Sequence, residues 1–459
     1  MSSDIIPMIQ PFFCKENVHF LIVDENVTID SNNYNTKRRL VTCTEVDRFS
    51  NLPENLIDLI LEKLPIQDAV KTHVLSKRWR YKWTSMRSLV LDKRFSEKFA
   101  KKGAFGHNGF IRITNQIFYF LKGPILKLHL HIPNMILDSF QEVDQWMLSL
   151  SRDGVRELVI INKKRRYQLP CYFFRCLELR KLKLGNCIIK PSLEFQGFLY
   201  LKNLSLKNIE FGANLHGTII NIPQLKKLKL FECTNVYNFK IKSTKLFVLV
   251  VISCPDATLL QLLNSKSVGL VFLKPIQGVE RVNLASLLSN MPCLCILLIN
   301  GYFLQFSIAE NIPKWLPHPA NSLELLTLYE FKFGDLFQLQ GVLCILRNSP
   351  NLERLDFDNQ DLENMHLDLD VKPALAYLEA FDCLHQTLNG LKTINIMDVE
   401  RSRPLLLFIK LLLEHSPTLE KISIRPRETS DANEKFNFAK DVIRFPRASS
   451  KAELVYLDP

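Results

Sequence analysis

The sequence predicts an α/β chain in which a small three-helix module precedes a curved solenoid with a parallel sheet on its concave face. Three observations carry this prediction. One apolar motif recurs from about residue 120 onward, the stretch before it has helical periodicity, and glycine is scarce, at 15 of 459 residues. A chain of this length holds about three domains or one long repeat array, and the recurrence favours an array.

Residues 1–45 have weak periodicity. They contain the polar run Ser31–Asn35 and the basic run Lys37–Arg39, and a short strand would fit Phe20–Val23. We expect a disordered N-terminal tail outside any domain.

The helical module spans residues 46–92. Pro53 suits the first turn of a helix, and apolar residues follow at helical spacing, namely Leu56, Ile57, Ile60, Leu61 and Leu64. Pro65 ends this helix, and a short second helix carries Ala69, Val70, His73 and Val74. A third helix is expected from Ser76, with Trp79 and Trp83 one turn apart. So small a module has more apolar side chain than it can cover, which indicates a partner surface.

The solenoid, residues 93–385, is predicted from the pattern apolar-x-x-apolar-x-apolar. The pattern begins at Ile125, Val155, Leu179, Leu201, Leu225, Leu246, Val268, Leu294, Leu323, Leu352, Leu391 and Leu419. Most intervals fall in the 20–29-residue range of a leucine-rich repeat, and one is 39. The alternating part of each motif predicts a short strand with one buried face, and parallel stacking of these strands predicts a curved solenoid.

Three prolines support this register. Pro292, Pro350 and Pro417 each follow the polar end of an apolar helical stretch and precede a motif. We expect the chain to become extended at each proline, with a strand two residues later.

The cysteines and histidines do not form a recognisable reactive or metal-binding pattern. The eleven cysteines show no paired CxxC spacing, and Cys187, Cys233 and Cys254 each lie three residues after a motif, where a leucine-rich repeat buries a small side chain. No nucleotide-binding or hydrolase motif is present. The acidic alternation at Leu367–Asp370 is interpreted as a solvated edge. We therefore expect no catalytic residue, metal or cofactor.

The outward strand positions should line the concave face, where solenoids bind ligands. They run from basic and polar to apolar, and the predicted substrate-binding residues are Lys181, Lys183, Asn203, Ser205, Lys227, Lys229, Val248 and Val250, with Leu270 and Phe272 beyond them. This order predicts a protein ligand with acidic groups next to an apolar anchor. The alternative is that the chain itself covers the apolar positions.

The module resembles an F-box. The resemblance rests on Asp47–Glu54 (DRFSNLPE), on Asp68-Ala69-Val70 and on Val74–Arg80 (VLSKRWR), and it covers about 46 residues. The whole chain resembles the plant F-box/leucine-rich-repeat family with a C-terminal FBD region. Trp146–Phe211 is similar to that family's first repeats, and residues 386–459, including His415–Ile422 and Phe445–Ser449, resemble the FBD, continuing the solenoid.

This resemblance implies a non-catalytic subunit of an SCF-type ubiquitin ligase. The F-box would dock a Skp-type adaptor and, through it, cullin and RING subunits, while the repeats would hold an unknown protein substrate. The adaptor contacts carried over are Leu52, Pro53, Leu56, Ile57, Ile60, Leu64, Pro65, Val70, Leu75, Ser76 and Trp79. Some of these must form the core of the module instead, and the sequence does not separate the two sets.

Two alternatives stay open. A repeat scaffold without a ubiquitin-ligase role is distinguished by failure to bind an adaptor. A nucleic-acid binder would use the lysine face and Lys163–Arg166 with a steep salt dependence, although the basic stretches lack the interleaved aromatic residues typical of single-strand binders. The excess of 59 basic over 47 acidic residues, +12, is modest.

No secretory signal is recognised, and the longest apolar runs fall short of the roughly 18 residues that cross a bilayer. We expect no nucleic-acid or membrane partner, and a location in the nucleus, the cytoplasm or both.

Overall fold

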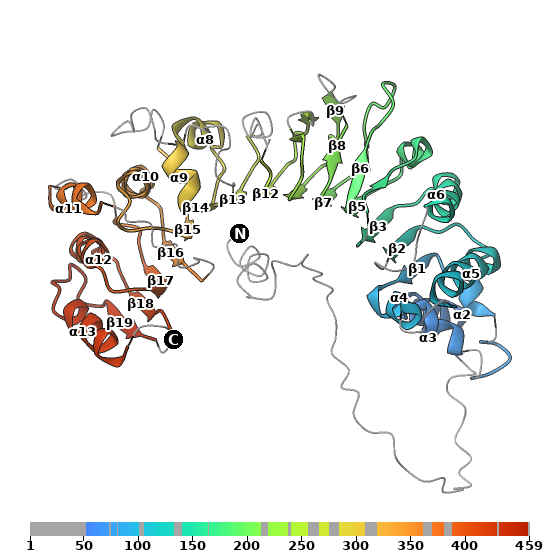
Figure 1. Ribbon diagram of the computed structural model, residues 1–459, viewed down its shortest axis with the longest axis horizontal. Helices are drawn as coiled ribbons and strands as arrows, with labels where there is room; N and C mark the ends of the chain where they lie inside the picture. The colour runs from blue at the N-terminus through green and yellow to red at the C-terminus, as the bar shows by residue number, and fades with distance from the viewer. Residues whose placement is uncertain are drawn as a thin grey trace, which may run out of the picture.

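The computed structural model forms an arch (Figure 1). It describes residues 52–72, 75–79, 81–100, 105–132, 140–163, 165–212, 219–236, 240–255, 266–274, 284–307, 319–360, 370–380, 388–428 and 431–457. The helical module lies at one end of the arch and the C-terminal strands lie at the other.

Within these residues, fourteen parallel strands form one sheet along the inner side of the arch. They are β1 (Ser88–Leu91), β2 (Lys127–Ile132), β3 (Glu157–Asn162), β5 (Lys181–Gly185), β7 (Asn203–Lys207), β10 (Lys227–Phe231), β12 (Val248–Ile252), β13 (Leu270–Lys274), β14 (Ile296–Asn300), β15 (Leu325–Tyr329), β16 (Arg354–Asp358), β17 (Thr393–Val399), β18 (Lys421–Pro426) and β19 (Glu453–Tyr456). The strands follow chain order, as stacked repeats require.

The predicted repeat register is confirmed. Each of the twelve motifs starts two residues before a strand of the large sheet, and its first apolar residue is at most 3% exposed. Every second residue of a strand is apolar and points away from the concave face into the core, as Leu182 and Leu184 do in β5. The core they form runs from Ile57 in the helical module to Ala452 at the C-terminal end.

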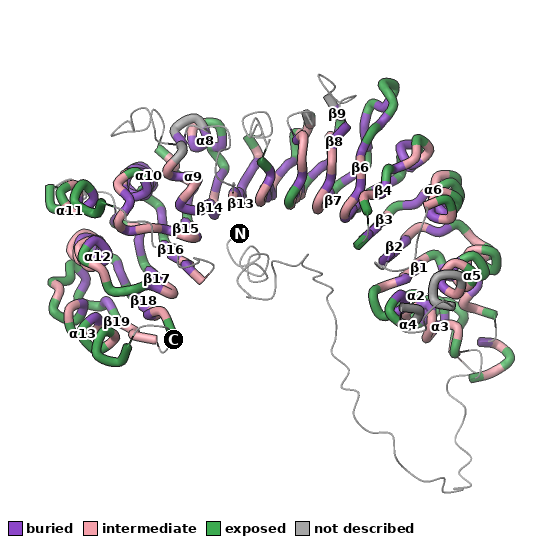
Figure 2. Tube along the Cα trace, viewed as in Figure 1, coloured by how far each residue is buried: buried purple, intermediate pink, exposed green. Residues whose placement is uncertain are grey.

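The outer side of the arch changes with repeat length. The helices are α2 (Glu54–Lys63), α3 (Ile66–Lys71), η5 (Lys82–Ser85), α4 (Lys93–Ala100), α5 (Phe105–Phe120), α6 (Gln141–Asp153), η6 (Cys171–Arg175), α8 (Leu284–Asn290), α9 (Gly301–Ser307), α10 (Leu336–Arg347), α11 (Lys372–Glu379), α12 (Arg403–His415) and α13 (Ala432–Ile443). Among the described residues, the repeats that begin at Val155, Leu179, Leu201 and Leu225 carry short strands on this side, and the first of them also holds η6. These strands are β4 (Tyr167–Gln168), β6 (Cys187–Ile189), β8 (Glu210–Phe211), β9 (Ile219–Asn221) and β11 (Lys240–Lys242). Figure 2 shows that exposed residues gather on this outer side.

The proline prediction was right about the helix ends and wrong about the strand starts. Helices α8, α10 and α12 end before Pro292, Pro350 and Pro417, but each strand begins four residues after the proline, not two. The chain first makes a turn, in which the Leu294 amide donates to the Met291 carbonyl and the Leu352 and Leu419 amides make the equivalent bonds. Proline favours the second position of such a turn.

The third helix expected from Ser76 is absent from the described part of the module. Successive turns take its place, with the Trp79 amide donating to the Ser76 carbonyl, and a 3₁₀ helix at Lys82–Ser85 follows. The first two helices lie as predicted, although His73 and Val74 fall outside the described residues. Strand β1 then joins the large sheet from inside the predicted module, because Met86-x-x-Leu89-x-Leu91 is itself a repeat motif.

The chain turns under the sheet at a recurrent left-handed residue. Asn186, Asn208, Glu232, Ser253 and Glu330 each have a positive φ and directly follow a strand of the large sheet. The next residue is buried in every case, and three of these are the predicted packing cysteines. The Cys187 thiol donates to the Gly185 carbonyl, and Cys233 contacts the Leu206 and Phe231 carbonyls. The packing interpretation of these thiols is confirmed.

We expect Leu206→Ala to destabilise the solenoid by about 2–5 kcal/mol, because it opens a cavity in the continuous core. Leu206 is 0% exposed. The matched control is Ser205→Ala, one residue earlier on the opposite face of β7, where we expect a change below about 0.5 kcal/mol. Urea unfolding followed by circular dichroism measures both, and equal effects would contradict the assignment of the two faces.

Candidate protein-interaction surfaces

Helix α2 separates the core of the helical module from an exposed apolar face. Ile57 and Leu61 are 0% exposed, one turn apart on the inner side. Leu56, Leu59 and Ile60 are 41%, 56% and 38% exposed beside them, and Leu75 is 48% exposed in the turn after α3. We call Leu56, Leu59, Ile60 and Leu75 the exposed apolar face. Apolar side chains this open on a small module are typical of a partner surface.

The structure thus divides the eleven predicted adaptor contacts. Ile57 and Trp79 belong to the core. The exposed residues are Pro53, Leu56, Ile60 and Leu75, and the half-buried ones are Leu52, Leu64, Pro65, Val70 and Ser76. Leu59 was missed by the sequence prediction, although its spacing of three residues from Leu56 and its exposure place it with this set.

An ion pair holds the two parts of the module together. The Lys82 ammonium lies 3.0 Å from a Glu54 carboxylate oxygen, which joins the start of α2 to η5. The hydrogen bond and the charge of Lys82 lower the pKa of Glu54. The Ser76 hydroxyl is buried without a hydrogen-bond partner in the described part of the module.

The predicted substrate residues lie in rows on the concave face. Lys181 aligns with Asn203 and then Lys227, and Lys183 aligns with Ser205 and then Lys229. The next strand brings Val248 and Val250 into the same two rows. These residues share a face as the sequence predicted, and their binding role remains a prediction.

Positive charge is concentrated on β5 and β10. Lys229 is half-buried, and burial together with the charge of Lys227 lowers its pKa. Burial likewise lowers the pKa of Lys227. The two ammonium groups therefore repel each other across β10.

One carboxylate lies at the end of this basic region that is nearer to the helical module. A Glu157 oxygen is 2.9 Å from His129 Nε2 and 2.7 Å from the Lys181 ammonium, and Lys127 lies 3.8 Å from the other oxygen. Burial acts to raise the pKa of Glu157, but the hydrogen bonds from His129 and Lys181 and the two lysine charges outweigh it and set the pKa at about 2. Three basic side chains therefore surround a single ionised carboxylate.

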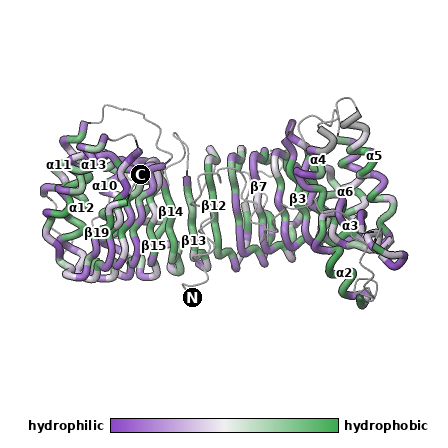
Figure 3. The backbone as a smooth tube through the Cα atoms, turned by 90° about the horizontal axis from the view of Figure 1, so that it is seen from below, coloured by the Kyte–Doolittle hydropathy of each residue, from purple (hydrophilic) through white to green (hydrophobic). Residues whose placement is uncertain are grey.

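An apolar cluster follows the lysines along the concave face. Its members are Val248, Val250, Leu270, Phe272, Ile296, Leu298 and Tyr329, on strands β12 to β15, and we call it the apolar strip. The Phe272 and Tyr329 rings lie 5.3 Å apart between centroids. Figure 3 shows these strands as the predominantly hydrophobic part of the sheet. The strip is buried, at 0–8% exposure, so Val248 and Val250 are covered and not open to solvent.

Polar side chains return beyond the apolar strip. The Arg354 guanidinium donates to Asp356 at 2.9 Å, and the Asn395 amide donates to the same carboxylate at 2.7 Å. Thr327 separates them from Leu298, and its hydroxyl is buried without a partner among the described residues. The concave face is therefore basic, apolar and then mixed polar along the arch.

One of the other sequence candidates contributes to the fold. In the basic run Lys163–Arg166, where residue 164 falls outside the described residues, Arg166 donates to Glu210 and to Asn208. Residues 367–369 of the acidic alternation and the tail run Lys37–Arg39 also lie outside the described residues. The described ranges hold no group of three His, Cys, Asp or Glu side chains placed to bind a metal, and no helix in them is long and apolar enough to cross a membrane.

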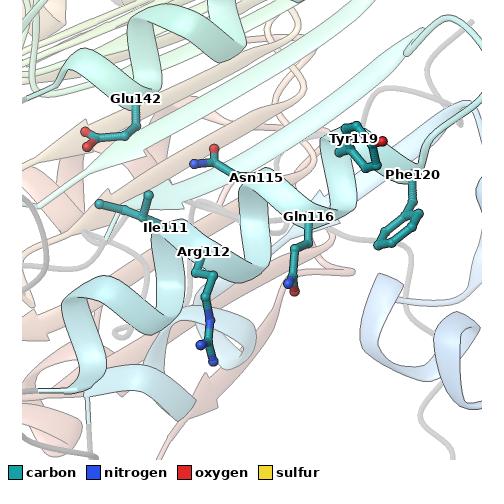
Figure 4. A pocket seen from close by; sticks show the side chains of 7 residues that line it. All are labelled: Ile111, Arg112, Asn115, Gln116, Tyr119, Phe120 and Glu142. Carbon is teal, nitrogen blue, oxygen red and sulfur yellow. The ribbon is translucent and has the colours of Figure 1, made fainter.

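A surface depression of about 730 Å³ lies on α5 and α6, away from the concave face (Figure 4). Ile111, Arg112, Asn115, Gln116, Tyr119, Phe120 and Glu142 line it. Phe120 is 50% exposed, and its ring meets that of Trp83 edge-on at 6.2 Å. This contact joins the end of α5 to the helical module.

Comparison with known proteins identifies both parts of the chain. The F-box domain model matches residues 49–91, and the model of the leucine-rich repeats of the FBD-associated F-box protein At5g56370 matches residues 143–357. The F-box/FBD/LRR-repeat protein At1g13570 of Arabidopsis thaliana is 29% identical over 90% of this chain and 98% of its own length. The chain thus has an F-box match followed by a match to FBD-associated leucine-rich repeats.

Other relatives of this chain come from the same plant. The probable FBD-associated F-box protein At1g32375 is 23% identical over 90% of this chain and 100% of its own length. The F-box/FBD/LRR-repeat protein At2g04230 is 31% identical over 44% of this chain and 46% of its own.

The position of Glu157 predicts a pH-dependent contribution to the stability of this protein. Its folded-state pKa of about 2 lies below the ordinary value of 4.5, so the ionised carboxylate stabilises the fold above about pH 4.5. That stabilisation is lost as the pH falls towards 2. We expect Glu157→Gln to cost about 1.5 kcal/mol or more at pH 7, and the difference from the parent protein should shrink between pH 4.5 and 2.

Thermal unfolding at a series of pH values measures this difference. Glu353→Gln is the matched control, because it removes an exposed ion pair with Lys392 and should have little effect at any pH. A constant difference between Glu157→Gln and the parent protein from pH 7 to pH 2 would contradict the assigned pKa.

Proposed function

We propose that this protein is the substrate-recognition subunit of an SCF-type ubiquitin ligase. Its F-box would dock a Skp-type adaptor, and through it cullin and RING subunits, while the concave face would hold a protein substrate. The observation that carries this proposal is the exposed apolar face of α2 on a module whose core is continuous with the solenoid.

The exposed apolar face has the properties of an adaptor-binding surface. Leu56, Leu59 and Ile60 are close together on one helix and lie outside the core. Their burial by a partner would remove apolar surface from water, at about 25 cal/mol per Å². The buried pair Ile57 and Leu61 holds the helix in place with this face turned outward.

The shared core gives the proposal its mechanism. Helix α3 contacts β1, and β1 pairs with β2, so the F-box is packed onto the first strands of the sheet. An adaptor bound to α2 would therefore hold the concave face at a fixed orientation. Ubiquitin transfer by the assembled ligase gains from this fixed geometry, because it raises the effective concentration of a substrate lysine near the ubiquitin donor. The chain itself would supply no catalytic residue and need no cofactor.

The basic end of the concave face supports an acidic substrate element. Lys183, Lys227 and Lys229 lie on neighbouring rows, and a carboxylate or phosphate group over them would be favoured by their combined charge. A repeat scaffold without a ligase role would use the same face and would fail to bind the adaptor. As a ligase subunit the protein would act in the nucleus, the cytoplasm or both.

We expect Leu56→Asp combined with Ile60→Asp to weaken binding of a plant Skp-type adaptor by about 30-fold or more, the effect of losing an interface hot spot. Both residues are exposed, so the fold should survive. Isothermal titration calorimetry with the purified adaptor measures the affinity, and circular dichroism checks folding.

Asp58→Asn, on the same helix and exposed, is the control for this variant and should bind normally. Failure of the folded parent protein to bind any Skp-type adaptor would favour the scaffold alternative. Unchanged affinity of the double variant would place the docking surface elsewhere on the module.

We expect Lys183→Glu combined with Lys229→Glu to reduce substrate recovery by about tenfold, because two attractive contacts become repulsive. The control is Lys372→Glu with Lys451→Glu, which makes the same change of net charge at exposed sites away from these rows. Quantitative mass spectrometry of proteins recovered with each variant, with proteasomal degradation blocked, gives the comparison. Equal recovery by both variants would remove the basic end from the substrate site.

A further inference from the structure

The apolar strip is buried on the side of the sheet that faces away from the main core. Val250 and Leu298 are 0% exposed, and Leu270 is 2% exposed. The strip forms a cluster of its own, separated from the main core by the sheet. Its burial therefore needs an explanation different from the packing of the repeats.

Neighbouring strands cover only the flanks of such side chains. On the same face, Lys183 and Ser205 have strands on both sides and remain half-buried. Among the described residues, no helix or strand lies over the concave face (Figure 1). Apolar side chains on the outward face of a sheet are stabilised when another segment packs over them.

We propose that residues 5–25 of this chain occupy the apolar strip. This segment contains Ile5, Ile6, Ile9, Phe12 and Phe13 and then the run Phe20–Val23, followed at once by Asp24 and Glu25. The apolar-then-acidic order matches the face, where Val248 and Val250 lie directly beside Lys227 and Lys229. The match combines hydrophobic burial with charge complementarity.

The connection to the F-box is long enough for this contact. Residues 26–51 join the segment to Leu52, and 26 residues span up to about 90 Å when extended. Strand β12 is six strand spacings from β1 in the sheet, which is about 29 Å at the usual separation of about 4.8 Å. The connection is therefore longer than the distance it has to span, and the segment can reach the apolar strip.

The contact would make the N-terminal segment an internal competitor of the substrate. This consequence rests on the proposed function, since it uses the same concave face. A substrate with an apolar anchor would have to displace the segment, and a substrate recognised by the lysines alone would still meet Asp24 and Glu25. The contact itself does not depend on adaptor binding.

Photo-cross-linking in the full chain tests the proposal. Benzoylphenylalanine replaces Phe12 or Leu21, the purified protein is irradiated, and mass spectrometry maps the linked peptides. We expect links within one chain from both positions to residues 248–252, 270–274 and 296–300. The same probe at Asn33, in the polar run, should give few links to these strands. Links to other surfaces, or links between two chains, would overturn the proposal.

Two sets of substitutions sharpen the test. Asp24→Lys with Glu25→Lys should lower the yield of strip links about fivefold, the equivalent of about 1 kcal/mol of ion pairing, and cannot disturb the packing of the solenoid. Val250→Asp should remove the links to β12, with circular dichroism as the folding check. Unchanged yields in both would also overturn the proposal. Adaptor affinity, measured on the same variants, should stay constant, so a failed ligase proposal is distinguishable from a failed contact.

Discussion

The structure depends on the burial of three apolar side chains that each repeat sends beneath the sheet. In the repeat that contains β10, for example, Leu225, Leu228 and Leu230 are all 0% exposed. A single repeat lacks the neighbouring repeats that pack against these side chains on either side, so the repeats are stable only when they are stacked. Stacking in parallel fixes the register from strand to strand, and the rows on the concave face follow from that register. The alignment of Lys183, Ser205 and Lys229 is thus a consequence of the core beneath them.

The same constraint explains which parts of the fold could be predicted from the sequence. The spacing of twelve motifs located twelve strands, because each strand requires its inward triplet. Strand β1 carries the signal in Met86, Leu89 and Leu91, but inside a stretch already assigned to helices. Strand β19 lacks it, because Lys451 stands where the other repeats have their first apolar residue. The stretch after Ser76 was predicted to be a helix from its capping residue and from the spacing of Trp79 and Trp83. Successive turns with hydrogen bonds between residues three apart form there instead, and the sequence pattern does not distinguish the two.

The candidate sites were less predictable, because residue type does not say which partner covers a side chain. Ile57 and Ile60 are both isoleucines and lie three residues apart on α2, in the same apolar pattern. Ile57 is nevertheless 0% exposed and Ile60 is 38% exposed. The difference arises from the position of α2 against the rest of the module, which a linear pattern does not encode. The concave rows were predictable from alternation alone, whereas the burial of the apolar strip was not, since Val250 has the same outward register as Lys229.

That contrast between Val250 and Lys229 bears on what the concave face does. The repeat fold requires apolar residues only at the inward positions, and the outward lysines of β5 and β10 show that polar side chains satisfy the same strand geometry. Seven outward apolar residues on consecutive strands pack against one another but are not required by the inward core of the repeats, and they would be unfavourable if open to water. Their burial by a segment of the chain or by a bound partner removes that penalty. The lysines on one side and the Asp356 network on the other remain polar, so they can fix the direction in which an occupant lies. The sheet thus has two apolar surfaces, one that holds the repeats together and one on the concave face, over which the contact with residues 5–25 is proposed.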